Sequence, residues 1–333
     1  MHSDLSFKAM GCQSRVVVNG ADHEGLATWA VDRIAQLESM WSRFRPDSEI
    51  SALNRNPGQM TSVSPETFAL IEHAIEAWEV TGRRFDPTML TELVEHGYDR
   101  THTELAPPKA ASWQPVGGAP SAGPTGLSRL RPASDLLAES EVGPRPESRT
   151  GEIVLVPALP AVMLPEGVSI DPGGIGKGLA ADIVASELVE QGADGALVDL
   201  GGDLRVIGEH PDGGSAWPVI VDPEVPGIEG YQVGLADGGI ATSSQLGRRW
   251  STETGDRHHL LDPRDGKPSA SPAAAVVVAG GAAWQAEVVA KAALLAGFEA
   301  GCRLITDNGS VGLLLGFDGT THDAGLLNAA ALV

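Results

Sequence analysis

The stretch SIDPGGIGKGLAAD, Ser169 to Asp182, has the pattern of a short strand that turns tightly into a helix. Its glycines allow backbone N–H groups to approach a ligand closely, and Lys177 stands where the predicted helix begins. Amides at a helix N-terminus, together with a lysine, can bind a diphosphate. The spacing matches neither a Walker A motif nor the GxGxxG dinucleotide fingerprint, and a glycine-rich turn without any ligand is the competing interpretation.

The composition indicates a folded, acidic protein. The chain has 333 residues, of which 42% are hydrophobic and 20% charged, so a packed core is expected rather than disorder. The formal net charge of −21 opposes binding to nucleic acid or to an anionic membrane surface. An anionic ligand would therefore need a site that is locally positive.

Cysteine usage and the N-terminus bear on the compartment. Cys12 and Cys302 allow at most one disulfide and suggest no zinc site. The N-terminus lacks the basic start and apolar run of a secretory signal, and no run of about 18 apolar residues could span a membrane. We therefore expect a cytoplasmic protein with no membrane span.

Apolar spacing and turn residues outline a mixed α/β chain. Ser64 as N-cap and Pro65 at the first helical position mark one helix start, and Ser48 begins a capped short turn that runs to Asn54. Helices are predicted over residues 25–44, 64–81, 179–191 and 282–296. Strands are predicted over residues 14–19, 152–158, 196–208 with a return at Gly201–Gly202, 217–222, 232–235, 239–243, 275–279 and 313–317.

Residues 107–130 interrupt this pattern with Pro, Gly, Ala and Ser. We interpret this stretch as a flexible surface insertion rather than a linker between independent domains, since ordered patterning resumes at Gly151. The chain is thus expected to form one domain, residues 1–333.

Three further places carry groups suited to chemistry. Asp86 lies before Pro87, which holds it extended and able to accept a hydrogen bond from a ligand, although Asp-Pro turns are common. His259 precedes an Asp-Pro turn and could act as a general base or phosphate ligand, or be structural. Glu287 and Lys291 share one face of an otherwise apolar helix, so this face is expected to point into a site, the alternative being a solvent-exposed ion pair.

Seven segments in this order resemble the FAD:protein FMN transferases, the ApbE-type flavin transferases. The similarity covers nearly the whole chain apart from the Pro-rich insertion, and the segments are specific jointly rather than singly. They are AMG (Ala9–Gly11), FRPDSEIS (Phe44–Ser51), FDPT (Phe85–Thr88), SIDPGGIGKGLAAD (Ser169–Asp182), VDLGGD (Val198–Asp203), IATS (Ile240–Ser243) and HLLDPRDG (His259–Gly266).

The resemblance implies an α/β (α+β) fold of the T-fold type in one compact unit. It also implies an enzyme that binds FAD and magnesium, transfers the FMN half to a threonine of a target protein, and releases AMP. The expected partners are thus FAD and an acceptor flavoprotein with a threonine site.

Residue by residue, the resemblance implies a site assembled from distant segments. His259 is the candidate for proton transfer, and Lys177 is both a catalytic and a dinucleotide-binding candidate. The other implied FAD contacts are Met10 and Phe44 against the rings, Arg84, Phe85 and Asp86 along the flavin, Asp171 beside the glycine-rich turn, and Leu261 through its backbone. Gly174 and Glu287 are the implied metal ligands.

This chain departs from the family pattern at the metal. Glu287 and Lys291 stand where the family usually has an aspartate and a threonine that bind magnesium. Glu287 can still bind a hard cation, but Lys291 cannot ligate a metal while charged. The Lys291 ammonium could take the place of magnesium and offset phosphate charge, which makes Lys291 a further FAD-binding candidate.

Three functions therefore stay open from the sequence. The first is the flavin transferase. The second is an FAD hydrolase that yields FMN and AMP, with water in place of the threonine. The third is a non-catalytic FAD-binding protein, which the altered metal residues favour more than a typical family sequence would. A nicotinamide dehydrogenase is not expected, because no GxGxxG opens a βαβ unit.

Overall fold

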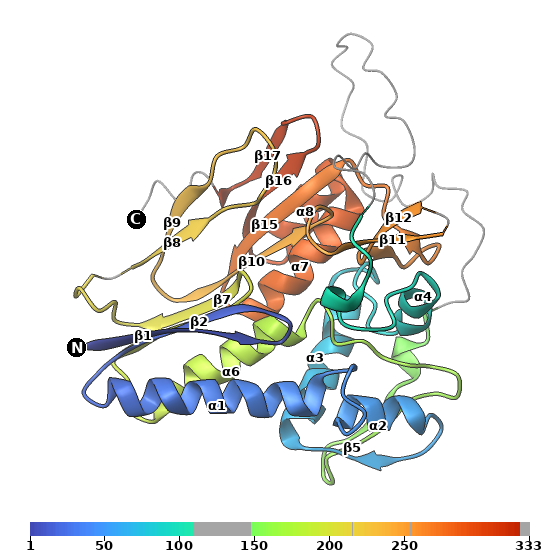
Figure 1. The fold of residues 1–333 in the computed structure, drawn as a ribbon, viewed down its shortest axis with the longest axis horizontal. Helices are drawn as coiled ribbons and strands as arrows, with labels where there is room; N and C mark the ends of the chain where they lie inside the picture. The colour runs from blue at the N-terminus through green and yellow to red at the C-terminus, as the bar shows by residue number, and fades with distance from the viewer. Residues whose placement is uncertain (109–147, 215, 254, 327–333) are drawn as a thin grey trace.

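A computed structural model describes residues 1–108, 148–214, 216–253 and 255–326 of the chain. Of the predicted insertion at 107–130, all but Pro107 and Pro108 lies outside the described residues. One large sheet forms the centre of the molecule, with helices on one face and a small two-stranded ribbon on the other (Figure 1).

The central sheet has eight strands, and every neighbouring pair is antiparallel. One of its inner strands, β15, is a run of Ala and Val that is buried on both faces, which explains why it shows no polar alternation. In spatial order the strands are β1 (His2–Ala9), β2 (Cys12–Asn19), β6 (Gly195–Leu200), β7 (Asp203–Gly208), β10 (Gly238–Ser244), β15 (Ala273–Gly280), β16 (Val311–Gly316) and β17 (Thr321–Ala324).

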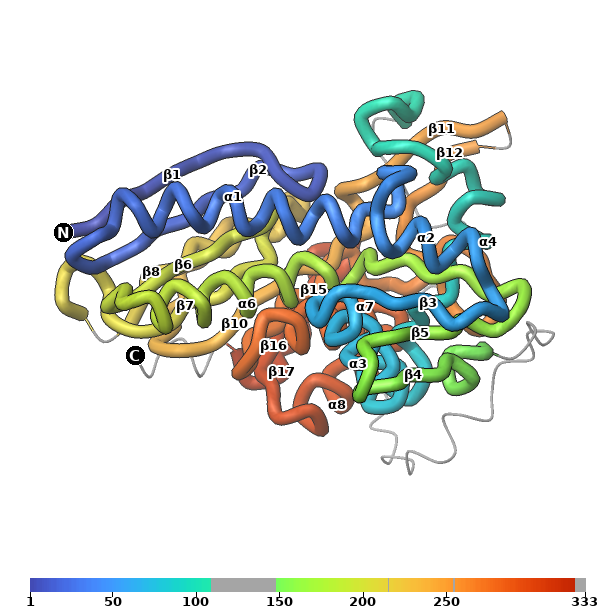
Figure 2. Tube along the Cα trace, turned by 90° about the horizontal axis from the view of Figure 1, so that it is seen from below, coloured from blue at the N-terminus to red at the C-terminus, as the bar shows by residue number. Residues whose placement is uncertain are grey.

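Three long helices cover one face of this sheet: α1 (His23–Trp41), α6 (Gly176–Glu190) and α7 (Ala283–Ala296). Figure 2 shows α1 and α6 running side by side along the sheet. The helices α6 and α7 also pack together, and a Cβ atom at Gly178 would lie only 2.5 Å from the carbonyl oxygen of Ala283. Glycine at this position therefore permits the close approach that brings side chains of α6 and α7 into one site.

Shorter elements surround these layers. The ribbon β8 (Trp217–Val221) and β9 (Tyr231–Leu235) buries Val219, Val221 and Val233 against the second face of the sheet. The remaining elements are α2 (Glu49–Arg55), β3 (Thr61–Ser62), α3 (Pro65–Val80), α4 (Leu90–Glu95), η1 (His102–Glu104), η2 (Thr150–Glu152), β4 (Val154–Val156), β5 (Ala161–Met163), β11 (Arg249–Thr252), β12 (Gly255–His258), β13 (Leu261–Asp262), β14 (Lys267–Pro268) and α8 (Phe298–Asp307).

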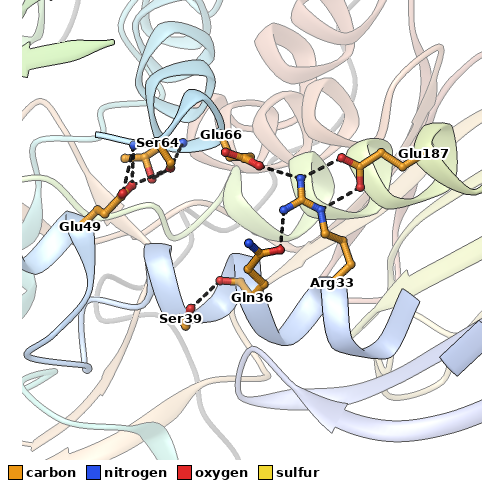
Figure 3. Close-up of polar contacts among 8 residues, drawn as sticks. Arg33, Gln36, Ser39, Glu49, Ser64, Glu66 and Glu187 are labelled. Carbon is orange, nitrogen blue, oxygen red and sulfur yellow. Dashed lines mark hydrogen bonds and ion pairs between the residues drawn. The ribbon is translucent and has the colours of Figure 1, made fainter. Parts of the chain in front are cut away.

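A charged cluster joins the three helices α1, α3 and α6 (Figure 3). The Arg33 guanidinium donates to both oxygens of Glu187 at 2.8 Å and to Glu66 at 2.7 Å. In the same figure, Glu49 accepts hydrogen bonds from the backbone N–H and hydroxyl of Ser64, the N-cap of α3. These contacts hold α2, α3 and α6 at defined positions relative to α1.

Most predicted elements are present, with instructive differences. The Ser64 cap is confirmed, but Ser48 caps a two-turn helix, α2, and not merely a short turn. The segment before the glycine-rich turn is not a strand: the Ile170 backbone bonds the Asn54 side chain, and the Asp171 N–H donates to Pro87, so no ladder forms. The two cysteines are free.

Strand β1 and helix α8 were not predicted. Most β1 side chains are partly or fully exposed, so the strand carries little apolar alternation for sequence analysis to detect. Within the described part of the chain, no helix is both long and apolar enough to cross a bilayer.

Candidate functional site

A cleft of about 660 Å³ opens where the start of α6, one face of α7, the β6–β7 turn and the end of β10 meet. Met10 and Phe44 lie on its wall, together with the glycine-rich turn at Gly173 and Gly174. The cleft is large enough for a small-molecule cofactor. Its lining gathers residues that lie as far apart in the sequence as Met10 and Lys291.

The Met10–Gly11 pair forms the two-residue turn between β1 and β2. Both residues have positive φ, 50° for Met10 and 69° for Gly11, as a type I′ hairpin turn requires. The turn of the AMG segment therefore brings the Met10 side chain to the cleft.

Lys177, at the start of α6, is surrounded by carboxylates. Its ammonium pairs with Asp203 at the start of β7 and lies 3.1 Å from Glu287 Oε1 on α7. The other Glu287 oxygen accepts the Gly178 N–H at 2.8 Å. Both carboxylates are nearly inaccessible, with side chains 3% and 5% exposed. In this arrangement the lysine offsets two buried negative charges before any ligand binds.

Helix α7 is capped from α6 and not by its own sequence. Its N-cap residue, Ala282, has no side chain that could accept a hydrogen bond. Asp182 accepts the N–H groups of Ala283 and Trp284 at 3.0 and 2.9 Å instead. Burial raises the pKa of Asp182, and these two hydrogen bonds work against that rise. The cap orients α7 so that Glu287 and Lys291 face the cleft.

Lys291 crosses beneath the glycine-rich turn. Its ammonium donates to the Gly173 carbonyl at 3.1 Å and lies 5.2 Å from the centre of the Phe85 ring. Gly174 has φ of +102°, and a Cβ atom there would lie 2.8 Å from Lys291 Cδ. Burial lowers the pKa of Lys291, whereas Asp171, Glu287 and Asp86 favour its charged form.

Arg43 and Asp171 form an ion pair at the start of the turn. Arg43 Nε lies 3.3 Å from Asp171 Oδ1, and both side chains are largely buried. The guanidinium also stacks on the rings of Phe44 and Tyr98, at 4.1 and 4.7 Å from their centres. Asp171 thus forms an ion pair with Arg43 and accepts a hydrogen bond from the Gly173 N–H.

His259 lies between the cleft and a small cavity that also contacts Asp86, Leu261 and Lys291. Its Nδ1 is 3.4 Å from the Arg248 carbonyl oxygen, to which it donates when protonated there. Burial, with the nearby cations Arg248 and Lys291, lowers the pKa of His259 well below its usual range. The imidazole is therefore neutral at pH 7, with Nε2 able to accept a proton.

Four sequence candidates lie outside the wall of the main cleft. Phe85 is fully buried in the core, and Leu261 packs in a separate apolar cluster with Met89 and Trp250. Asp86 is buried and accepts hydrogen bonds from Thr88 and Thr150. Arg84 is half-buried, and burial lowers its pKa. Asp86 and Leu261 line the small cavity that His259 and Lys291 also contact.

Other cleft residues were not singled out from the sequence. Asp203 lies in the VDLGGD segment, and Arg43 directly precedes the FRPDSEIS segment. The segments that resemble the family could therefore have pointed to both residues. Arg248 follows the IATS segment, and its side chain lines the cleft beside His259. Nothing local in the sequence distinguishes Arg248 from Arg249, which is buried.

Comparison with known proteins gives a consistent result. The family model described as the ApbE family matches residues 10–315. A Treponema pallidum (strain Nichols) protein named FAD:protein FMN transferase is 28% identical over 290 residues, which cover 82% of this chain and 72% of that protein. A Vibrio cholerae protein of the same name is 26% identical over 303 residues, covering 86% of this chain and 78% of that one.

Solved structures share the fold. The ApbE protein from Thermotoga maritima superimposes with a TM-score of 0.78 at 22% identity, covering 99% of each chain. The apo form of the Pseudomonas stutzeri flavinyl transferase ApbE gives a TM-score of 0.72 at 22% identity, over 97% of this chain and 95% of that one. The layered sheet and its cleft thus define a mixed α/β protein of a known fold. Since the family model spans most of its length, the chain belongs to the ApbE family.

Proposed function

We propose that this protein binds FAD in the cleft and transfers its FMN half to a threonine hydroxyl of a target protein, with release of AMP. The relatives named FAD:protein FMN transferase support this activity. The observation that carries the proposal is the joint placement, around one cleft, of the glycine-rich turn, two lysines and a neutral histidine.

The reaction needs a base, and His259 suits that role. The threonine oxygen forms a bond to the flavin-side phosphorus, the bond from that phosphorus to the AMP oxygen breaks, and the hydroxyl proton passes to His259 Nε2. Because Nδ1 faces the Arg248 carbonyl, the free lone pair belongs to Nε2. The lowered pKa of His259 keeps that lone pair available at pH 7.

The diphosphate needs positive charge, and the cleft offers Lys291 and Arg248. Both side chains line the cleft, and among the described residues neither forms an ion pair. The positive charge of Lys177 is already balanced by its ion pairs with Asp203 and Glu287. Groups that stabilise charge developing on the leaving phosphate contribute strongly to such reactions.

The residues implied as magnesium ligands do not fit that ion. Magnesium requires near-octahedral oxygen ligands at about 2.0–2.1 Å. Both Glu287 oxygens already bond Lys177 and the Gly178 N–H, and the Lys291 ammonium lies under the turn that carries Gly174. In the parts of the chain that the structure describes, no three His, Cys, Asp or Glu side chains cluster as metal ligands. We therefore assign no step to a metal.

Covalent labelling tests the proposal. Purified protein is mixed with FAD and a target protein that carries an acceptor threonine, and flavin fluorescence on a denaturing gel and AMP by chromatography are measured. We expect both products, and His259→Gln should slow their formation by roughly 10²–10⁴-fold with FAD affinity nearly unchanged. His322→Gln, remote from the cleft in a stack with Phe298, is the control.

The same assay separates the two rival functions. AMP without labelled protein would identify an FAD hydrolase and overturn the transferase. Bound FAD with neither product would leave a flavin-binding protein without catalytic activity.

A further inference from the structure

The Lys291 ammonium occupies a position built to hold a cation. It donates to the Gly173 carbonyl at 3.1 Å and lies 5.2 Å from the centre of the Phe85 ring, whose face attracts positive charge. The carboxylates of Asp171, Glu287 and Asp86 all act on it electrostatically. These groups surround Lys291 from the turn, from its own helix and from the Phe85–Asp86 segment.

The surroundings also restrict any additional cation there. An ammonium group has no lone pair with which to ligate a metal, and its positive charge repels a divalent ion placed among the same carbonyl and carboxylate neighbours. The fit is tight, since the Lys291 chain passes close enough to Gly174 that a Cβ atom would meet it at 2.8 Å. Lys291 thus fills the space between the turn and α7 and still lines the cleft.

We propose that Lys291 is a built-in counter-ion for the FAD diphosphate, so that this protein binds FAD without any divalent metal. This inference rests on the proposed function, because it concerns how the same cleft holds FAD. One donor of the ammonium is used by Gly173, and the others are available to phosphate oxygens. The ligand part that Lys291 recognises is the diphosphate, which riboflavin lacks.

A binding measurement tests this without requiring catalysis. FAD and riboflavin are titrated into the wild-type protein, with flavin fluorescence as the signal, once in excess magnesium and once in excess chelator. We expect the FAD dissociation constants in the two conditions to agree within about twofold, well short of the tenfold change that about 1.4 kcal/mol of binding energy would produce.

Substitutions of Lys291 then test whether its charge is responsible for the FAD affinity. Lys291→Met should weaken FAD binding roughly 10- to 100-fold, the loss of one charged hydrogen bond, and leave riboflavin affinity nearly unchanged. Lys291→Arg, which keeps the charge, should recover part of the FAD affinity. Lys267→Met removes an exposed lysine in β14 and should change neither affinity.

Each unfavourable result of these measurements leads to a different conclusion. Tight FAD binding in magnesium that is lost in chelator would overturn the counter-ion role and leave the proposed function intact. Equal weakening of FAD and riboflavin in Lys291→Met would show a structural role instead. A wild-type protein that binds FAD under neither condition would overturn both this inference and the proposed function.

Discussion

Lys177 on α6 and Glu287 on α7 are 3.1 Å apart, Nζ to Oε1, and the same lysine pairs with Asp203 on β7. One ammonium therefore joins two helices and the sheet at the base of the cleft. Since Asp203 and Glu287 are almost fully buried, removing the lysine would leave both carboxylates poorly solvated and without their counter-charge. The contact makes the stability of the fold depend on a residue of the site.

Lys177→Met should destabilise the protein as well as alter the cleft. It leaves two buried carboxylates without their counter-charge, and we expect the free energy of unfolding to fall by about 3–5 kcal/mol. Chemical denaturation measures the change. Adding Glu287→Gln to Lys177→Met should restore part of the lost stability. A Lys177→Met protein as stable as the wild type would contradict the importance of the buried ion pair.

Gly174→Ala should displace Lys291. The residue has φ of +102°, and its Cβ atom would lie 2.8 Å from Lys291 Cδ. We expect FAD affinity to fall roughly tenfold and stability by about 1–2 kcal/mol, the usual cost of a left-handed backbone for a non-glycine residue. Flavin fluorescence titration and denaturation report the two effects.

Gly213→Ala is the matched control for this prediction. Gly213 also has positive φ, +78°, but its Cβ atom would meet nothing within 4 Å. It should lose stability through the backbone alone and keep FAD affinity. Equal FAD affinities in the Gly174 and Gly213 variants would argue against a contact between Gly174 and Lys291.

Arg33→Met should remove the ion pairs that connect α1 to α3 and α6. Its side chain is 12% exposed and bonds two carboxylates on two other helices, so we expect a loss of about 1–2 kcal/mol in stability. Arg15→Met removes the pair with Asp4, where both side chains are 51% and 43% exposed, and should cost about 0.5 kcal/mol or less. Comparable denaturation midpoints for the two variants would refute the role assigned to Arg33.

His258 should make stability depend on pH. Its Nε2–H donates to the Ser269 carbonyl and its Nδ1 accepts the Leu260 N–H, so the folded state holds a neutral imidazole. Burial lowers the pKa of His258 to about 4. As the pH falls, His258 takes up a proton in the unfolded chain before it does so in the folded protein. The stabilisation is therefore complete above about pH 6.5 and is lost as the pH falls towards 4.

The predicted size of this effect is about 2 kcal/mol between pH 7 and pH 5. Denaturation curves at several pH values measure it. His258→Gln should be less stable at pH 7 but should have a flatter pH dependence over this range. Wild-type and variant curves that run parallel would show that His258 does not titrate as argued.

Local pattern predicted much of the scaffold. The Ser64 cap, the alanine- and leucine-rich helices and the buried strand at residues 275–279 were all readable, because caps and apolar periodicity are properties of neighbouring residues. The seven ordered segments also indicated the ApbE family, which the family model matches over residues 10–315. The spacing of Glu287 and Lys291 predicted one shared helix face, and in the structure both residues line the same cleft.

The partners of those side chains came only from tertiary structure. Glu287 lies one helical turn from Lys291, yet it pairs with Lys177, which is more than 100 residues away in sequence. The strand expected before the glycine-rich turn is absent because Asn54 and Pro87 satisfy its backbone. Spacing along the chain predicts which residues share a helix face, but the packing of helices determines which charged side chains contact each other. Here the close approach of Gly178 to Ala283 brings α6 and α7 together.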